Sequence, residues 1–159
     1  MIIEKFIEKG TIKKIVETEI SRYINFFTNS YEENLNHCKT VLTTFPRWSI
    51  ISGYYAMHDI TKLFLVKKFL IKIDSKVHKT TIRIMKEITE DKQLLKLLKI
   101  GFKHFTKMAA DLEEAKDKRQ EAQYYTGSEF MKEKYKEEAG IFLNNIVLPY
   151  LNKINSMIK

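Results

Sequence analysis

The sequence predicts an all-α protein whose helices form one bundle, a single domain over residues 1–159. Helix breakers are scarce, because the 159 residues include five Gly and two Pro. Such a composition favours helices over a turn-rich sheet protein. Apolar residues make up 44% of the chain, recur at the three- and four-residue intervals of one helical face, and are numerous enough for a single core.

The first half of the bundle starts with two amphipathic segments. Apolar residues at helical spacing predict a helix over residues 12–27. Asn29 and Ser30 follow it, and both residue types favour the N-cap of a new helix. We therefore expect a second helix over 31–45, which ends before Pro46 because a residue that precedes proline disfavours the α conformation.

The next helices are predicted in the same way. A third helix, over about residues 47–70, is apolar nearly all round, so we expect it at the centre of the bundle. A shorter helix then runs to about residue 90, and a long helix to about residue 124. Thr-Gly-Ser at 126–128 combines a helix stop with a new N-cap, which predicts a last helix to about residue 157.

Several classes of protein are disfavoured. Cys38 is alone and cannot form an internal disulfide, and no amino-terminal segment has the features of a secretion signal, so we expect a cytoplasmic protein. Charged residues interrupt the most apolar region, 48–73, well short of the ~18 apolar residues of a membrane span, so we expect no membrane. There is no Cys-x-x-Cys, no His pair at metal spacing and no glycine-rich loop, so we expect no metal and no cofactor.

The positive charge of the chain is concentrated in one region. The net charge is +8, and residues 62–107 alone carry thirteen Lys and Arg against four acidic residues. Five lysines of this region fall on one face of the long helix, where like charges oppose helix formation. We call them the lysine ridge: Lys92, Lys96, Lys99, Lys103 and Lys107. A phosphate-rich or acidic partner explains this pattern, and so does a surface that only keeps the protein in solution.

The predicted central helix carries a polar sector. Tyr54, His58 and Lys62 are spaced by four residues, and Tyr55 and Asp59 flank them. A hydroxyl, an imidazole, a carboxylate and an ammonium group therefore share one side of a mainly buried helix. Polar groups at this depth need partners. His58 is interpreted either as a satisfied core histidine or as a catalytic group.

Arg119 is placed where the long helix has its apolar side, seven residues after Leu112. A guanidinium stays charged, so an inward-facing arginine requires an acid, carbonyl groups, water or an anionic ligand. Asp59 is the obvious acid, in which case the pair has a structural role. Alternatively, Arg119 hydrogen-bonds the last carbonyls of its helix at the edge of the bundle.

Two segments carry a resemblance to a known family. The segment SGYYAMHDITKLFLVKKFLIKIDSKVHKTT, residues 52–81, combines paired aromatics with a later histidine, His78. The segment RQEAQYY is similar to an Arg-x-x-Ala-Asp-Tyr motif, with Arg119, Ala122 and Tyr124 in register and Gln123 in place of Asp. In this order and spacing, both segments resemble HEPN domains, small helical nucleotide-binding proteins of prokaryotes.

The resemblance implies an antiparallel bundle of four to five main helices. It also implies a homodimer, often encoded beside a minimal nucleotidyltransferase as a toxin–antitoxin pair. Many members are metal-independent ribonucleases, marked by Arg and, after four to six residues, His. This chain departs from that signature, because those offsets from Arg119 fall on Tyr124, Tyr125 and Thr126. The usual general acid and base is therefore missing from its place.

The sequence is compatible with three functions. The first is a non-catalytic binding module for a nucleotide, an RNA phosphate or a nucleotidyltransferase partner, held by Arg119, Tyr124, Tyr54, Tyr55, Asp59, Lys62 and His78. The second is a divergent ribonuclease in which His58, His78 or His104 reaches Arg119 through the fold or across a dimer. The third is a purely structural partner of another protein.

Overall fold

The computed structural model describes the backbone of residues 2–118 and 124–159, and the side chains of residues 2–110 and 133–159. Its elements are α1 (Ile2–Glu8), β1 (Ile12–Lys14), α2 (Glu17–Thr40), α3 (Pro46–Phe69), β2 (Ile71–Ile73), α4 (Val77–Ile88), α5 (Lys92–Lys118), α6 (Tyr124–Phe142), a π-helical turn η2 (Leu143–Val147) and α7 (Leu148–Ile158). The all-α prediction is confirmed, and a small two-stranded sheet is added to it.

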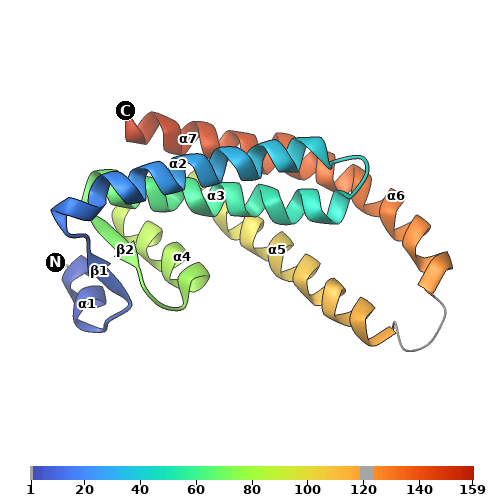
Figure 1. Cartoon of the computed structure of the whole chain (residues 1–159), viewed down its shortest axis with the longest axis horizontal. Coiled ribbons are helices and arrows are strands. Elements are labelled where there is room, and N and C mark those ends of the chain that lie inside the picture. The colour runs from blue at the N-terminus through green and yellow to red at the C-terminus, as the bar shows by residue number, and fades with distance from the viewer. Residues whose placement is uncertain (1, 119–123) are drawn as a thin grey trace.

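Helix α3 is the central helix, as predicted. It packs against α2, α4, α5, α6 and α7, and Figure 1 shows α2 and α7 running beside it. Ile50, Ile60 and Val66 are all fully buried although they lie on different sides of α3. Burial of one such side chain contributes roughly 1.5–3 kcal/mol, so α3 is the main source of the core.

Buried hydroxyl groups connect α3 to its neighbours. The Ser49 hydroxyl donates to the carbonyl of Cys38 on α2 at 2.7 Å. The Thr61 hydroxyl donates to the carbonyl of Met57 at 2.7 Å, so its oxygen accepts the hydroxyl of Tyr150 on α7 at 2.6 Å. These polar groups are satisfied inside the protein, which is the condition for burying them.

The prediction of two helices over residues 12–45 is wrong. A single helix, α2, runs through Asn29 and Ser30. Cap-type residues end a helix only where the chain also turns, and no proline or glycine interrupts this segment. The Ser30 hydroxyl instead donates to Asp59 on α3 at 2.6 Å, so a tertiary contact replaces the expected cap.

Residues 12–14 form a strand instead of the start of a helix. Strands β1 and β2 pair antiparallel, with Ile12 opposite Ile73 and Lys14 opposite Ile71. Leu70 ends α3 in the left-handed conformation, at φ 54°, and turns the chain into β2. Ile12 is fully buried, so the short sheet holds the amino-terminal segment against the end of α3.

The carboxyl-terminal helices differ from their predicted bounds. Asp91 caps α5 by accepting the N–H of Leu94 at 2.9 Å, and α5 is described as far as Lys118. Gly127 and Ser128, predicted to form a turn, lie inside α6. A single helical glycine costs about 1 kcal/mol, which a 19-residue helix tolerates. The π-helical turn η2 lies immediately before α7, whose second residue is Pro149, and a widened turn relieves the clash of the proline ring with the preceding carbonyl groups.

Candidate functional site

Helix α3 separates the predicted site residues into two groups. Tyr54, Tyr55 and His58 face α4 and α5, where their rings meet those of His78 and Phe105. Asp59 and Lys62 face α2, where their partners include Ser30 and Phe27. His58 and Asp59 are consecutive residues, so the two groups differ in the helices that they contact and not in their position along α3.

The first group forms an aromatic–histidine cluster, made of Tyr54, Tyr55, His58, His78, Phe102 and Phe105. Tyr54 is fully buried, and its ring stacks on Phe105 at 4.7 Å and 21°. The rings of His58 and His78 are 4.7 Å apart. The structure therefore brings together two histidines that are separated by a loop and a strand in the sequence.

Hydrogen bonds determine the state of His58. The Thr81 hydroxyl donates to the carbonyl of Val77 at 2.8 Å, so its oxygen accepts a hydrogen bond from Nε2 of His58 at 3.1 Å. Nδ1 of His58 is then the unprotonated nitrogen, and among the described residues it has no hydrogen-bond partner. His58 is 1% exposed. Burial, with the nearby Lys62 and His78, lowers its pKa to about 2, against a weaker opposing effect of the Val77 backbone.

His78 is the more accessible of the two histidines of the cluster. Its Nδ1 is hydrogen-bonded to the Tyr54 hydroxyl at 2.9 Å, and its side chain is half-buried. Burial, followed by the charge of Lys62, lowers the pKa of His78. Burial also raises the pKa of Tyr54, which stays protonated. The cluster is thus a neutral core network with one histidine at its edge.

Asp59 has a structural environment. Its Oδ2 accepts Ser30 at 2.6 Å and Asn34 at 3.1 Å, both from α2, and its Oδ1 accepts Lys62 at 3.3 Å. The carboxylate is therefore committed to tying α2 to α3. The expected partner, Arg119, lies outside the described residues.

Tyr124 is the first residue of α6, and its side chain also lies outside the described residues. The predicted grouping of Arg119 and Tyr124 with the α3 residues thus stays a prediction.

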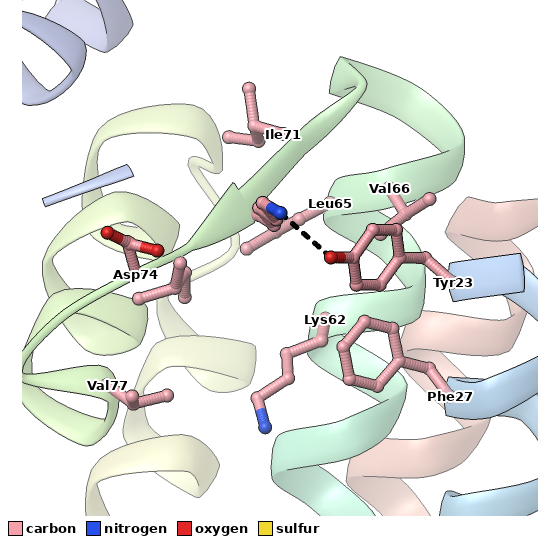
Figure 2. A pocket seen from close by; sticks show the side chains of 10 residues that line it. Tyr23, Phe27, Lys62, Leu65, Val66, Ile71, Asp74 and Val77 are labelled. Carbon is pink, nitrogen blue, oxygen red and sulfur yellow. Dashed lines mark hydrogen bonds between the residues drawn. The ribbon is translucent and has the colours of Figure 1, made fainter. Parts of the chain in front are cut away.

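Lys62 lies at a cavity between α2, α3, β2 and the start of α4, with a volume of about 240 Å³. Figure 2 shows Tyr23 and Phe27 of α2 across this cavity from Asp74 and Val77. We call it the lysine pocket, and its lining residues are Tyr23, Phe27, Lys62, Leu65, Val66, Ile71, Lys72, Ile73, Asp74 and Val77. Lys62 is the one predicted site residue among them.

Two lysines of the pocket rest on aromatic rings. The Lys62 ammonium lies 5.3 Å from the centre of the Phe27 ring, and that of Lys72 lies 4.9 Å from the Tyr23 ring. Lys72 also donates to the Tyr23 hydroxyl at 2.8 Å, the bond drawn dashed in Figure 2. This bond lowers the pKa of Tyr23 and raises the pKa of Lys72.

Sequence reasoning missed Tyr23, Phe27 and Lys72. Tyr23 and Phe27 occur in the predicted amphipathic stripe of a helix, where aromatic residues are ordinary core residues. Lys72 reaches them because β2 pairs with β1 beside the start of α2. This pairing joins segments far apart in the chain, so no local pattern identifies the pocket.

The lysine ridge is exposed, as predicted. All five of its lysines lie on the solvent side of α5, whereas Leu94, Leu98 and Met108 on the opposite side are buried. The sequence has no Asp or Glu from residue 92 to residue 110. Lys107, at one end of the ridge, contacts Glu138 of α6 at 3.4 Å.

His104 lies on α5 away from the aromatic–histidine cluster. Its Nδ1 is 3.0 Å from the same Glu138 oxygen that Lys107 contacts, beside a second cavity of about 280 Å³ lined in part by Ile141 and Phe142 of α6. Its described contacts therefore join α5 to α6.

Comparisons of the chain with family models, with curated proteins and with solved structures give no match. Within residues 2–118 and 124–159, no helix is both long and apolar enough to cross a bilayer. In the same part of the chain, no three His, Cys, Asp or Glu side chains form a group that could hold a metal ion.

Proposed function

We propose that the protein is a non-catalytic, HEPN-type module that binds RNA through the lysine ridge. One observation carries this proposal: α5 presents five exposed lysines on one face, in a stretch of 19 residues without an acidic residue. Like charges three or four residues apart destabilise a helix by roughly 0.2–0.5 kcal/mol per pair. A polyanion that lies along the ridge removes this repulsion.

The apolar face of α5 favours a nucleic acid over a lipid surface as the partner. A helix that binds a membrane inserts its apolar side into the interface. In α5, Leu94 and Leu98 are already buried in the core. The ridge therefore offers charge without an apolar face, which suits a phosphate backbone.

Binding of this kind depends on salt. If three to five ridge lysines each neutralise one phosphate, the logarithm of the affinity falls against the logarithm of the salt concentration with a slope of roughly −2 to −3.5 for single strands. Fluorescence anisotropy of labelled single-stranded RNA, measured at several salt concentrations, gives this slope.

A charge-matched pair of variants tests the ridge. Lys96, Lys99 and Lys103 changed together to Gln should weaken RNA binding at least tenfold and flatten the salt slope by about 2. Lys5, Lys9 and Lys39 are also exposed and lie outside the ridge, so their replacement by Gln is the control. Equal weakening in both variants would show that net charge, not the ridge, attracts RNA.

Ribonuclease activity is the second candidate, because His78 is neutral, half-buried and oriented by Tyr54. Cleavage without a metal joins the 2′-oxygen to phosphorus and breaks the bond to the 5′-oxygen, so one group accepts a proton and another donates one. His58 is enclosed, which leaves His78 as the one candidate in the cluster. Labelled RNA that is cut in chelator by the wild type and not by His78→Ala would support the enzyme, and intact RNA would remove it.

The resemblance further supports two partners, a second copy of the chain and a minimal nucleotidyltransferase. Sedimentation velocity tests the homodimer directly. A monomer across the micromolar range would remove that part of the proposal and leave RNA binding in place.

A further inference from the structure

We propose that the lysine pocket is a separate binding site for a small phosphate monoester. The pocket lies between α2, α3, β2 and α4, and none of its lining residues belongs to the lysine ridge. The inference therefore stands whether or not the ridge binds RNA.

Two partly buried ammonium groups point to an anionic ligand. The side chains of Lys62 and Lys72 are 22% and 27% exposed. An ammonium has three N–H donors, and the structure shows Lys62 bonded to Asp59 and Lys72 bonded to Tyr23. Each lysine therefore keeps donor capacity for a ligand.

Acidic residues around the pocket are already neutralised. Asp74 pairs with Lys13 at 2.8 Å. Glu19 pairs with Arg22 at 3.0 Å and reaches Lys72 only at 4.0 Å. Asp59 is buried and shares its charge with Ser30 and Asn34 besides Lys62. Four cations thus face three carboxylates around the pocket, and the remaining positive charge favours an anion.

The pocket binds anions through lysine. Arginine recognises carboxylate and phosphate alike with its flat, two-pronged guanidinium, but no arginine lines the pocket among the described residues. Lysine acts as a point charge and is a common phosphate ligand. Two ammonium groups on one cavity favour a phosphate monoester, which offers three acceptor oxygens, over a carboxylate, which offers two.

The volume and lining of the pocket favour a compact ligand. The volume of about 240 Å³ lies below the roughly 300 Å³ at which pockets for drug-sized ligands begin. The ammonium groups lie over the rings of Phe27 and Tyr23, so stacking of a base on those faces would displace them. Leu65, Ile71 and Val77 offer apolar contact instead, and Tyr23 and Asp74 offer polar atoms for hydroxyl groups. A sugar phosphate has this chemistry, either as a free molecule or as the phosphorylated end of a strand.

Calorimetric titration with ribose 5-phosphate tests the site. Lys72→Met should weaken binding at least tenfold, and Val77→Phe, which fills the cavity without changing its charge, should do the same. Lys67 is exposed on α3 and does not line the pocket, so Lys67→Met has the same charge change and should bind as the wild type does. No binding by the wild type, or equal loss in Lys67→Met, would overturn the proposal, and so would binding of ribose as tight as that of its phosphate.

Competition identifies the source of the phosphate. Displacement of ribose 5-phosphate by an oligonucleotide with a 5′-phosphate, and not by one with a 5′-hydroxyl, supports a strand end as the ligand. Failure of both to displace it supports a free sugar phosphate. The variant with Lys96, Lys99 and Lys103 changed to Gln should bind ribose 5-phosphate as the wild type does, so failure of the ridge and failure of the pocket are distinguishable.

Discussion

The aromatic–histidine cluster and the lysine pocket include residues of α3 one turn apart, His58 and Lys62. The two regions differ in whether they leave such a polar side chain exposed. His58 is enclosed among rings, and its pKa falls to about 2. Lys62, four residues later, is partly exposed and contacts the carboxylate of Asp59. The imidazole therefore stays neutral, whereas the ammonium forms an ion pair. The difference shows that burial and partners, together with residue type, decide which polar groups of α3 can meet a ligand.

The largest effect should come from Asp59, which lies between the two regions. Its removal leaves Ser30, Asn34 and Lys62 without their acceptor, and the carboxylate side chain is only 8% exposed. Asp59→Ala should therefore lower the free energy of unfolding by about 3 kcal/mol, measured by urea denaturation. The control is Asp74→Ala, which breaks an exposed pair with Lys13 and should lower the free energy of unfolding by less than about 1 kcal/mol. Similar losses in the two variants would contradict the structural role of Asp59.

Acid should weaken the fold through His58. In the unfolded chain this histidine binds a proton near pH 6.5, whereas in the folded protein it does so only near pH 2. The unfolded state binds more protons in between, so stability falls as the pH drops below about 6.5. From pH 7 to pH 4.5 the loss is roughly 2 to 3 kcal/mol.

His58→Gln removes this titration while its amide can still contact Thr81. The variant should therefore lose less stability between pH 7 and pH 4.5 than the wild type, measured by denaturation at each pH. Parallel curves for the two proteins would mean that His58 is not held neutral.

A smaller effect is expected at the edge of the cluster. Tyr54→Phe removes the hydrogen bond to His78 and keeps the stacked ring, which should cost about 1 kcal/mol. A double-mutant cycle with His78→Phe isolates this bond, because the coupling free energy of the pair should also be about 1 kcal/mol. A coupling near zero would mean that the two side chains contribute independently.

The smallest effect on stability should come from the pocket. Lys72→Met removes a partly exposed cation and keeps its apolar stem, so the free energy of unfolding should change less than it does in Tyr54→Phe. The pKa of Tyr23 should rise in this variant, because Lys72 is the main cause of its lowering. Ultraviolet titration of the tyrosines detects this rise. A large loss of stability would make the pocket a structural region like the cluster.

The candidate site was predictable in part. Spacing by four placed Tyr54, His58 and Lys62 on one sector of α3, but it could not show that Asp59 and Lys62 turn to α2 while Tyr54 and His58 turn to α4 and α5. These directions depend on which helix packs on which side. The pairing of Asp59 with Arg119 lies outside the described residues and stays a prediction.

By itself, the sequence determined the helical class of the fold, the central position of α3 and the exposed lysine ridge, because each follows from periodicity within one helix. Tertiary structure alone decided that α2 runs through Asn29 and Ser30, that residues 12–14 pair with 71–73, and that Lys72 meets Tyr23. The physical reason is that these features depend on contacts between residues far apart in the chain. The free energies of such contacts cannot be derived from the spacing of residues within one segment.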